Sequence, residues 1–268
     1  WQGKETGSPV DFDDIDREAA REIIDAAFNG DEEIDEEKGA WLDPDDVDAI
    51  LAAYGIDIPK AKVVETAAEA VEFWEEVGGS IVLKVVSPTA VHKSDVGGIA
   101  LDVSGKEAIE AAFEQVTSAV DDAEGALVQE FVSGGHEVLV GMVEDPNFGP
   151  LIVFGLGGIF VELMQDVSFR INPLTNIDAK EMLAEVKSAK LLEGYRGGAA
   201  GDLDAIQELL LRLSVLVEQV TEIAEIDLNP VKVLPPGKGA VVVDARIKIR
   251  PVKGVFLPSR KDIPGRML

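Results

Sequence analysis

The chain has 268 residues, enough to bury the core of one large domain or of two lobes. Its 51 Asp and Glu against 24 Lys and Arg give a net charge of -27, which disfavours nucleic acid as a partner. The sequence contains no cysteine, which excludes disulfides and thiolate metal sites. The longest apolar stretch, 151–164, is too short to span a bilayer and the acidic N-terminus does not resemble a signal peptide, so we expect a cytoplasmic protein without a membrane partner.

The first half of the chain alternates between short helices and strands. Residues 1–40 form an acidic extension or linker with one amphipathic helix that stops at Gly30. Asp43 and Pro44 predict the start of a second helix, which ends at Gly55. The later segments are predicted as strands at 61–65, 80–86, 98–103 and 126–132 and as helices at 66–78 and 106–120.

The second half begins with a predicted strand pair, 136–143 and 150–156. Helices follow around 178–192 and 203–220, and a β-hairpin over 226–249 closes the body. Strands and helices are mixed without strict βαβ alternation, which favours an α+β protein of two lobes over a doubly wound sheet.

One loop contains an unusual set of side chains. The segment SPTAVHKSDVGG, residues 87–98, follows a predicted strand and contains His92, one of only two histidines. Gly97 and Gly98 give its exit the backbone freedom of glycine. The segment is either an ordinary surface turn or a loop that handles phosphate through a histidine that itself reacts.

The hairpin sets four polar side chains on one face. A turn at 235–238 places Asn229 opposite Asp244 and Asp227 opposite Arg246. Because side chains alternate along a strand, these four share a face, and the other face takes the apolar Ile226, Leu228, Val243, Ala245 and Ile247. Such oxygen ligands beside an Arg suit magnesium bound to nucleotide phosphates, although a solvated face with a cross-strand ion pair is the alternative.

Lys84 lies within the apolar run SIVLKVV, and two interpretations are open. A Lys in a β-branched run often protects an edge strand from pairing. Alternatively, its ammonium reaches the phosphates of a nucleotide. The chain has no Walker A motif, and GLGGIF at 155–160 does not match the dinucleotide-binding pattern, so any ATP site uses another arrangement.

Three blocks together resemble a known family. They are SIVLKVVSPTAVHKSDVGGIAL, VQEFVSGGHEVLVGMVEDPNFGPLIVFGLGGIFVE, and EIDLNPVKV with VVVDARI. In this order they are similar to the ATP-grasp β subunit of ADP-forming acyl-CoA synthetases, of the acetyl-CoA type, and more distantly to succinyl-CoA synthetase. The resemblance covers about 41–250. It implies an ATP-grasp fold of two α+β lobes clamping a nucleotide, at 41–130 and 131–256, between the extension 1–40 and a tail at 257–268.

The resemblance also assigns site residues. Lys84 resembles the lysine that contacts the nucleotide phosphates. The segment VQEFV resembles the inter-lobe hinge, where backbone groups and Glu130 meet the adenine. The full set of nucleotide contacts that it implies is Lys84, Gly97, Gly98, Glu130, Phe131, Val132, Glu137 and Arg170. The magnesium ligands are Asn229 and Asp244, Asp227 faces a phosphohistidine, and Arg246 holds the transferring phosphate, whereas His136 is incidental.

The resemblance gives the loop histidine a chemical role. The family converts acyl-CoA, ADP and phosphate into the free acid, CoA and ATP, with magnesium. A CoA-binding α subunit or domain carries a first reactive histidine, and His92 matches the histidine that takes the phosphate from it and delivers it to ADP. Neutral imidazole is a competent nucleophile near pH 7. The implied partners are therefore nucleotide, phosphate and the α chain, in an α2β2 complex or a fused equivalent.

Two alternatives belong to other functional classes. The first is a non-catalytic, nucleotide-sensing ATP-grasp module of a fused acetyltransferase. The second is a carboxylate ligase that works through an acyl phosphate and needs no reactive histidine. The presence of Lys84, His92, Asp227, Asn229 and Asp244 argues against the non-catalytic module.

Overall fold

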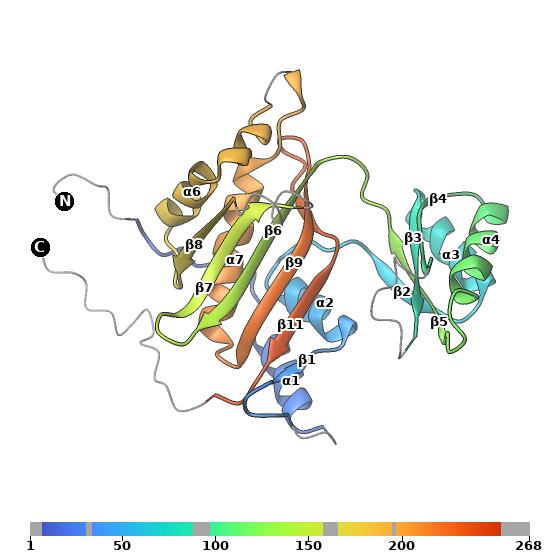
Figure 1. The fold of residues 1–268 in the computed structure, drawn as a ribbon, viewed down its shortest axis with the longest axis horizontal. Helices are drawn as coiled ribbons and strands as arrows, with labels where there is room; N and C mark the ends of the chain where they lie inside the picture. Colours follow the sequence, from blue (N-terminus) through green and yellow to red (C-terminus); the bar gives the residue numbers. More distant parts are fainter. Residues whose placement is uncertain (1–6, 31–33, 88–96, 158–165, 195–196, 253–268) are drawn as a thin grey trace, which may run out of the picture. The chain divides into compact units, whose positions relative to one another are not determined.

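The computed structural model describes residues 7–30, 34–87, 97–157, 166–194 and 197–252 (Figure 1). Their contacts divide the chain into two compact units. The first unit contains the chain up to Ile58 and again from Gly134, and the second unit is Pro59–Ser133. The chain therefore leaves the first unit once and returns to it once.

The first unit is built on a seven-stranded sheet, antiparallel in every strand pair of the described residues. The strand order is β1-β11-β9-β6-β7-β8, with β10 also paired to β9. The strands are β1 (Ala40–Trp41), β6 (His136–Asp145), β7 (Gly149–Leu156), β8 (Val167–Ile171), β9 (Ile223–Val233), β10 (Ala240–Val242) and β11 (Ala245–Ile249).

Helices pack against one face of this sheet (Figure 1). They are α1 (Arg17–Phe28), α2 (Pro44–Ala53), α6 (Asn176–Glu185), the 3-10 helix Lys187–Leu191 and α7 (Leu203–Gln219). The long helix α7 begins where the Asp202 carboxylate accepts a hydrogen bond from the Ala205 amide. Its buried Leu210 and Leu213 join Met142 and Ile226 of the strands in one core. The opposite face, called the open face below, carries exposed side chains.

The second unit is smaller and also consists of an antiparallel sheet packed against helices. A four-stranded antiparallel sheet in the order β2-β5-β3-β4 packs with two helices around its own core. Its elements are β2 (Ala61–Val64), α3 (Ala67–Val77), β3 (Ile81–Val86), β4 (Ile99–Val103), α4 (Lys106–Thr117) and β5 (Gly125–Glu130). Thr66 and Glu69 form a reciprocal capping box at the start of α3, and Gly78 ends it in the left-handed conformation.

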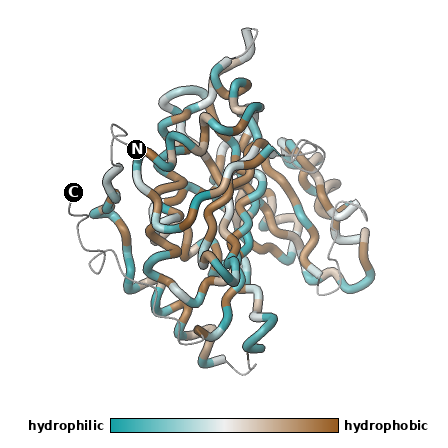
Figure 2. Tube along the Cα trace, turned by 60° about the vertical axis from the view of Figure 1, so that its left-hand side comes forward, coloured by the Kyte–Doolittle hydropathy of each residue, from teal (hydrophilic) through white to brown (hydrophobic). Residues whose placement is uncertain are grey.

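The architecture confirms the expected α+β class and most of the predicted elements. Figure 2 shows hydrophobic and hydrophilic stretches that alternate along the chain trace. Two strands were not predicted: β1, which has only two residues, and β8, whose sequence VSFRI is short and contains an Arg. No helix among the described residues is long and apolar enough to cross a membrane.

The N-terminal region is not a separate linker, contrary to the sequence-based expectation. Ala20 and Ile24 of α1 are fully buried in the core of the first unit. Arg21 binds Glu222, with 2.9 Å between the guanidinium and the carboxylate. Arg212 of α7 bonds Asp14 at 2.9 Å and lies 4.2 Å from the ring centre of Phe12.

The expected lobe boundaries also need correction. We expected a first lobe at 41–130, but α2 packs in the core of the first unit, so the second unit begins only at Pro59. The reason is the pattern of α2 itself, in which Val47, Ile50 and Leu51 are buried against the large sheet. The expected boundary near residue 130 lies close to the observed one at Ser133.

The burial of α1 makes a testable prediction about stability. Replacing Ile24 by Ala should lower the free energy of unfolding by about 2–5 kcal/mol, because the side chain leaves a cavity in a packed core. The control Glu22→Ala changes an exposed position of the same helix and should stay within about 0.5 kcal/mol of the wild type. Urea unfolding measures both, and equal effects would show that α1 does not belong to the core.

Candidate active site on the hairpin face

The hairpin of β9, β10 and β11 has the register that the sequence predicts. Arg246 lies opposite Asp227 in the strand pairing, and the backbone N–H of Asn229 donates a hydrogen bond to the backbone carbonyl of Asp244 at 3.0 Å. Asp244 and Arg246 are exposed, and Asp227 is partly buried. The structure therefore brings Asp227, Asn229, Asp244 and Arg246 together on the open face, as the alternation of the strands required.

Hydrogen bonds within the turn and hydrogen bonds to Asp202 hold the turn of the hairpin. Within the turn, the Lys238 amide donates to the Pro235 carbonyl at 2.9 Å. From outside, the Asp202 carboxylate at the start of α7 accepts hydrogen bonds from the amides of Gly237 and Gly239, at 2.8 and 3.0 Å. These charge-assisted bonds hold the turn and, with it, the register of the strands that follow.

One detail of the hairpin differs from the expectation. Val243 was expected on the apolar face, but Val242 is buried and Val243 only partly. The difference arises because β10 ends at Val242 and β11 begins at Ala245, so the alternation of faces shifts between them. Opposite this break, burial along β9 shifts from Leu228 to Val231.

Asp227 is partly buried and is surrounded by charged side chains. Burial raises the pKa of Asp227 above its ordinary value. The Arg246 guanidinium opposes this shift, and the carboxylates of Asp244 and Glu225 add to it. Asp227 is thus electrostatically coupled to both its cross-strand partner and the neighbouring acids.

Asn229 and Asp244 fit the protein side of a magnesium site. Both are exposed and adjacent, and they offer the hard oxygen donors that magnesium prefers. Among the described residues, no group of three or more His, Cys, Asp or Glu side chains could hold a metal ion by itself. A pair of protein ligands is nevertheless sufficient for magnesium that also binds phosphate oxygens and water.

The open face extends beyond the predicted residues. Glu225 lies two positions before Asp227 and pairs with Lys248, whose ammonium is 4.0 Å from its carboxylate. Lys248 also lies 5.2 Å from the ring centre of Trp41 on β1. Strand alternation would have indicated Glu225 and Lys248 from the sequence, whereas the two-residue strand around Trp41 gives no such signal.

Arg170 does not belong to this face, contrary to the expectation that it contacts phosphates. It pairs with Ile152 of β7, which is buried on the helix side of the sheet. Paired residues share a face, so Arg170 and Asp227 lie on opposite sides of the sheet. The expectation was wrong because β8 was not recognised, and its faces could not be assigned.

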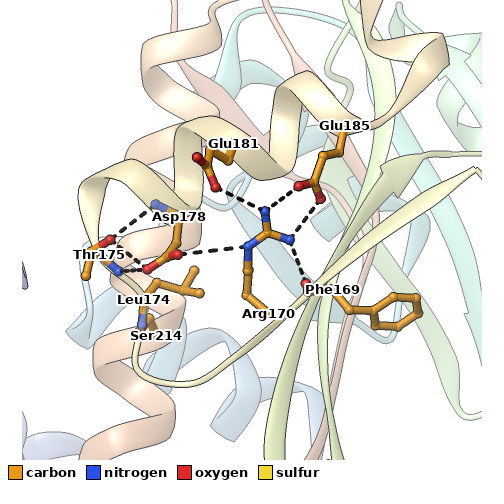
Figure 3. A network of polar contacts seen from close by, with 8 residues as sticks. All are labelled: Phe169, Arg170, Leu174, Thr175, Asp178, Glu181, Glu185 and Ser214. Atoms are coloured by element: carbon orange, nitrogen blue, oxygen red, sulfur yellow. Dashed lines mark hydrogen bonds and ion pairs between the residues drawn. The ribbon is translucent and has the colours of Figure 1, made fainter. Parts of the chain in front are cut away.

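Arg170 instead binds the acidic surface of α6 (Figure 3). Its guanidinium holds Glu185 in two hydrogen bonds of 2.6 and 2.8 Å. Glu181 and Asp178 lie 3.6 and 3.9 Å away, and the hydrogen bonds to Glu185 chiefly raise the pKa of Arg170. Thr175 and Asp178 cap the same helix reciprocally, so this network fixes α6 to β8.

Lys84 lies on an interior strand of the second unit. Strand β3 pairs with β5 on one side and β4 on the other, which excludes the role of an edge protector. Lys84 is partly exposed on the face away from the helices, because Leu83 and Val85 fill the core.

The expected hinge lies at the end of the second unit. The Glu130 amide donates to the Lys60 carbonyl at 2.8 Å, and the Phe131 amide donates to the Ser80 carbonyl at 2.9 Å. Val132 follows just before the chain leaves the unit at Ser133. The backbone amides of Glu130 and Phe131 therefore already donate hydrogen bonds within the unit. Carbonyl oxygens and the Glu130 side chain are the groups left to contact an adenine base.

The remaining predicted positions have separate surroundings. Glu137 forms a cross-strand ion pair with Lys232 at 2.7 Å, which the sequence did not indicate. Gly97 has a positive φ of 76°, and the Gly98 carbonyl accepts the Val85 amide. His92 lies outside the described residues.

Comparisons with known proteins agree with this fold. The family of ATP-grasp domains matches residues 33–249, so the chain is an ATP-grasp protein. It is 39% identical over 240 residues to the β subunit of acetate–CoA ligase [ADP-forming] I of Pyrococcus furiosus, covering 87% of this chain and 99% of that subunit. It belongs, more particularly, to the family of the β subunits of ADP-forming acetate–CoA ligases.

A longer relative and solved structures support the same family. Acetate–CoA ligase [ADP-forming] I of Archaeoglobus fulgidus is 45% identical over 239 residues, covering 87% of this chain and 33% of the relative. The chain thus spans about a third of the length of that relative. The dinucleotide-forming acetyl-coenzyme A synthetase 1 of Ca. Korarchaeum cryptofilum, solved with coenzyme A, Ca-AMPCP and HgCl+, matches with a TM-score of 0.76 and 41% identity, covering 87% of this chain and 100% of that chain. Another structure of it holds Mg-AMPPCP, with its phosphohistidine segment pointing towards the nucleotide binding site.

The position of Arg170 predicts that its replacement lowers the stability of the fold but leaves the affinity for nucleotide unchanged. Arg170→Ala should lower the free energy of unfolding by about 1–2 kcal/mol, because it leaves three clustered carboxylates without their cation. Magnesium–ATP affinity should stay within about twofold of the wild type, since Arg170 faces away from Asp227. Calorimetry and urea unfolding measure the two effects, with exposed Lys190→Ala as a charge control. A large loss of nucleotide affinity in a folded variant would restore Arg170 to the site.

Proposed function

We propose that this chain is the nucleotide-binding β part of an ADP-forming acyl-CoA synthetase. The observation that carries the proposal is the hairpin face, where the strand register brings Asp227, Asn229, Asp244 and Arg246 together. Family membership supplies the reaction class, in which acyl-CoA, ADP and phosphate give the acid, CoA and ATP.

The residues of the hairpin face divide into two roles. Asn229 and Asp244 would hold magnesium, which when bound would supply positive charge to the phosphate oxygens. Arg246 offers the transferring phosphate a guanidinium whose planar donors suit its oxygens. Asp227 orients the phosphorylated imidazole by accepting its ring N–H, in the manner of a carboxylate that fixes a histidine.

The second unit supplies the other nucleotide contacts. The Lys84 ammonium, on a partly exposed side chain of the interior strand β3, binds phosphate oxygens. Glu130 and the carbonyl groups at the end of β5 accept hydrogen bonds from the adenine amino group. Glu137 contacts the nucleotide in one of two ways: after its ion pair with Lys232 opens, or together with Lys232.

His92 carries the phosphate in this proposal. Its neutral imidazole attacks the phosphorus of a phosphohistidine on the partner, so that one P–N bond forms as another breaks. An oxygen of the β-phosphate of ADP then attacks the phosphorus, and the P–N bond to His92 breaks to release ATP. The CoA site and the first histidine belong to an α subunit or domain, joined in an α2β2 complex or by fusion.

The metal role of the hairpin is tested by Asp244→Asn. We expect the affinity for magnesium–ATP to fall by at least about tenfold, because even outer partners of a metal commonly carry that much. Calorimetry with magnesium–ATP and with ATP in EDTA separates metal-dependent binding from the rest. Asp121→Asn, an exposed change of the same charge, is the control. Equal magnesium dependence in Asp244→Asn and the wild type would contradict the assignment.

The histidine role is tested in the enzyme assembled with its α chain. His92→Ala should abolish ATP formation from acyl-CoA while nucleotide affinity stays within about twofold, because the hairpin face and Lys84 remain. His136→Ala is the matched control, since the His136 ring contacts the Ala199 carbonyl at 2.7 Å and has no proposed chemistry.

Mapping of acid-labile radiolabelled phosphate by peptide gives an independent readout of the same step. Label on the peptide that contains His92 supports the proposal. Label confined to the α chain, together with normal turnover of His92→Ala, would refute the relay through this histidine.

A further inference from the structure

A cavity lies at one end of the large sheet, where the turn between β6 and β7 comes next to the end of α7. Its volume is about 330 Å³, which falls within the range of small-molecule sites. Its walls come from the turn, residues 144–150, from the end of α7 and from the chain after β11. The cavity is separate from the hairpin face, because Asp145 lies about 13 Å along β6 from Gly141, the partner of Asp227.

The turn gives the cavity an aromatic wall. Phe148 lines it and is 61% exposed, so its ring meets solvent rather than the core. Pro146 and Pro150 line the cavity on the same turn, and they add apolar surface without flexible side chains. The face of an aromatic ring is electrostatically negative, so this wall attracts a cation as well as an apolar group.

The charged side chains of the wall leave an excess of negative charge. Glu144 and Arg250 both line the cavity and form an ion pair with each other. Asp145 is the second carboxylate of the wall, and its Oδ1 accepts hydrogen bonds from the backbone amides of Asn147 and Phe148 at 2.8 and 3.0 Å. These bonds fix the carboxylate in the turn and engage one of its two oxygens. Because Arg250 is paired with Glu144, the charge of Asp145 remains to attract a ligand of opposite sign.

The end of α7 adds to the negative potential. The helix ends at Gln219, and Val217 and Thr221 on either side of this end line the cavity. The carbonyl groups at the end of a helix give it a partial negative charge, which favours a cation nearby. The last turn of α7 contains no basic residue. The net charge of -27 acts in the same direction.

We propose that this cavity binds a small organic ammonium ion with an apolar body, of the quaternary type that choline represents. The ring of Phe148 contacts the alkyl groups of the cation, and the Asp145 carboxylate balances its charge. A quaternary ammonium suits these walls better than a primary one, because a primary ammonium is strongly hydrated and loses hydrogen bonds to water beside a ring and prolines. An anion would be repelled by Asp145 and by the end of α7. This binding needs neither magnesium nor nucleotide.

The test on the wild-type chain compares two ligands by calorimetry, without nucleotide. The probes are choline and its uncharged carbon isostere, in which a tert-butyl group replaces the trimethylammonium. Choline should bind at least about fivefold more tightly than the isostere, because only the cation gains from the ring and from Asp145. Added salt should weaken the binding of choline and leave that of the isostere unchanged.

Two variants assign the binding to the proposed walls. Phe148→Leu keeps an apolar wall but removes the ring, and choline affinity should fall by about threefold or more. Asp145→Asn keeps a side-chain oxygen for the turn and removes the charge, so it should weaken choline binding and reduce its salt dependence. Phe169→Leu is the matched control, since Phe169 is also an exposed phenylalanine, on β8, and does not line the cavity.

Nuclear Overhauser contacts between the methyl protons of choline and the ring protons of Phe148 give a direct readout of the same contact. They should be present in the wild type and in Phe169→Leu. Four outcomes would overturn the inference: no choline binding by the wild type, equal affinity for the isostere, an equal loss of affinity in Phe169→Leu, or binding of trilysine in place of choline. The last outcome would assign the cavity to a basic peptide segment instead.

Discussion

The pairing of β9 with β11 is the constraint on which the candidate site depends. Side chains alternate along each strand, so a slip of one residue would turn Asp227 towards the core and Ile226 towards solvent. Such a slip would bury an acid and expose an apolar side chain, and both changes are unfavourable. The register is also held at both sides, by β6 along the length of β9 and by the hydrogen bonds of Asp202 to the turn.

The two faces of the large sheet explain why Arg170 and Arg246 have different roles. Arg170 faces the helices, where its guanidinium is mostly covered and needs the carboxylates of α6 as partners. Arg246 is exposed on the open face opposite Asp227, so its guanidinium donors are accessible to a ligand. Two arginines on the same sheet therefore differ because their strands present them to opposite sides.

Local patterns predicted the parts of the site whose geometry is local. The hairpin register followed from a turn of four residues and from alternation, so Asp227, Asn229, Asp244 and Arg246 were placed correctly together. The sequence could not show that Lys84 lies on an interior strand, because β3 is flanked by β4 and by the distant β5. The ion pair of Glu137 with Lys232 likewise depends on pairing between strands almost a hundred residues apart. The burial of α1 was missed because its charge suggested solvent, whereas Ala20 and Ile24 on one stripe decide its packing.

The charge of the chain gives magnesium a specific place in the proposed chemistry. A nucleotide is itself an anion, and on the open face it would meet the neighbouring carboxylates of Asp227, Asp244 and Glu225. Lys248 already lies beside Glu225 and the ring of Trp41, so its charge is largely committed. Arg246 is then the main cation of the hairpin for the phosphates, and it is also coupled to Asp227. A divalent ion on Asn229 and Asp244 would convert a carboxylate that repels phosphate into one that holds it. In the proposed chemistry the acidic face would therefore bind nucleotide through the metal.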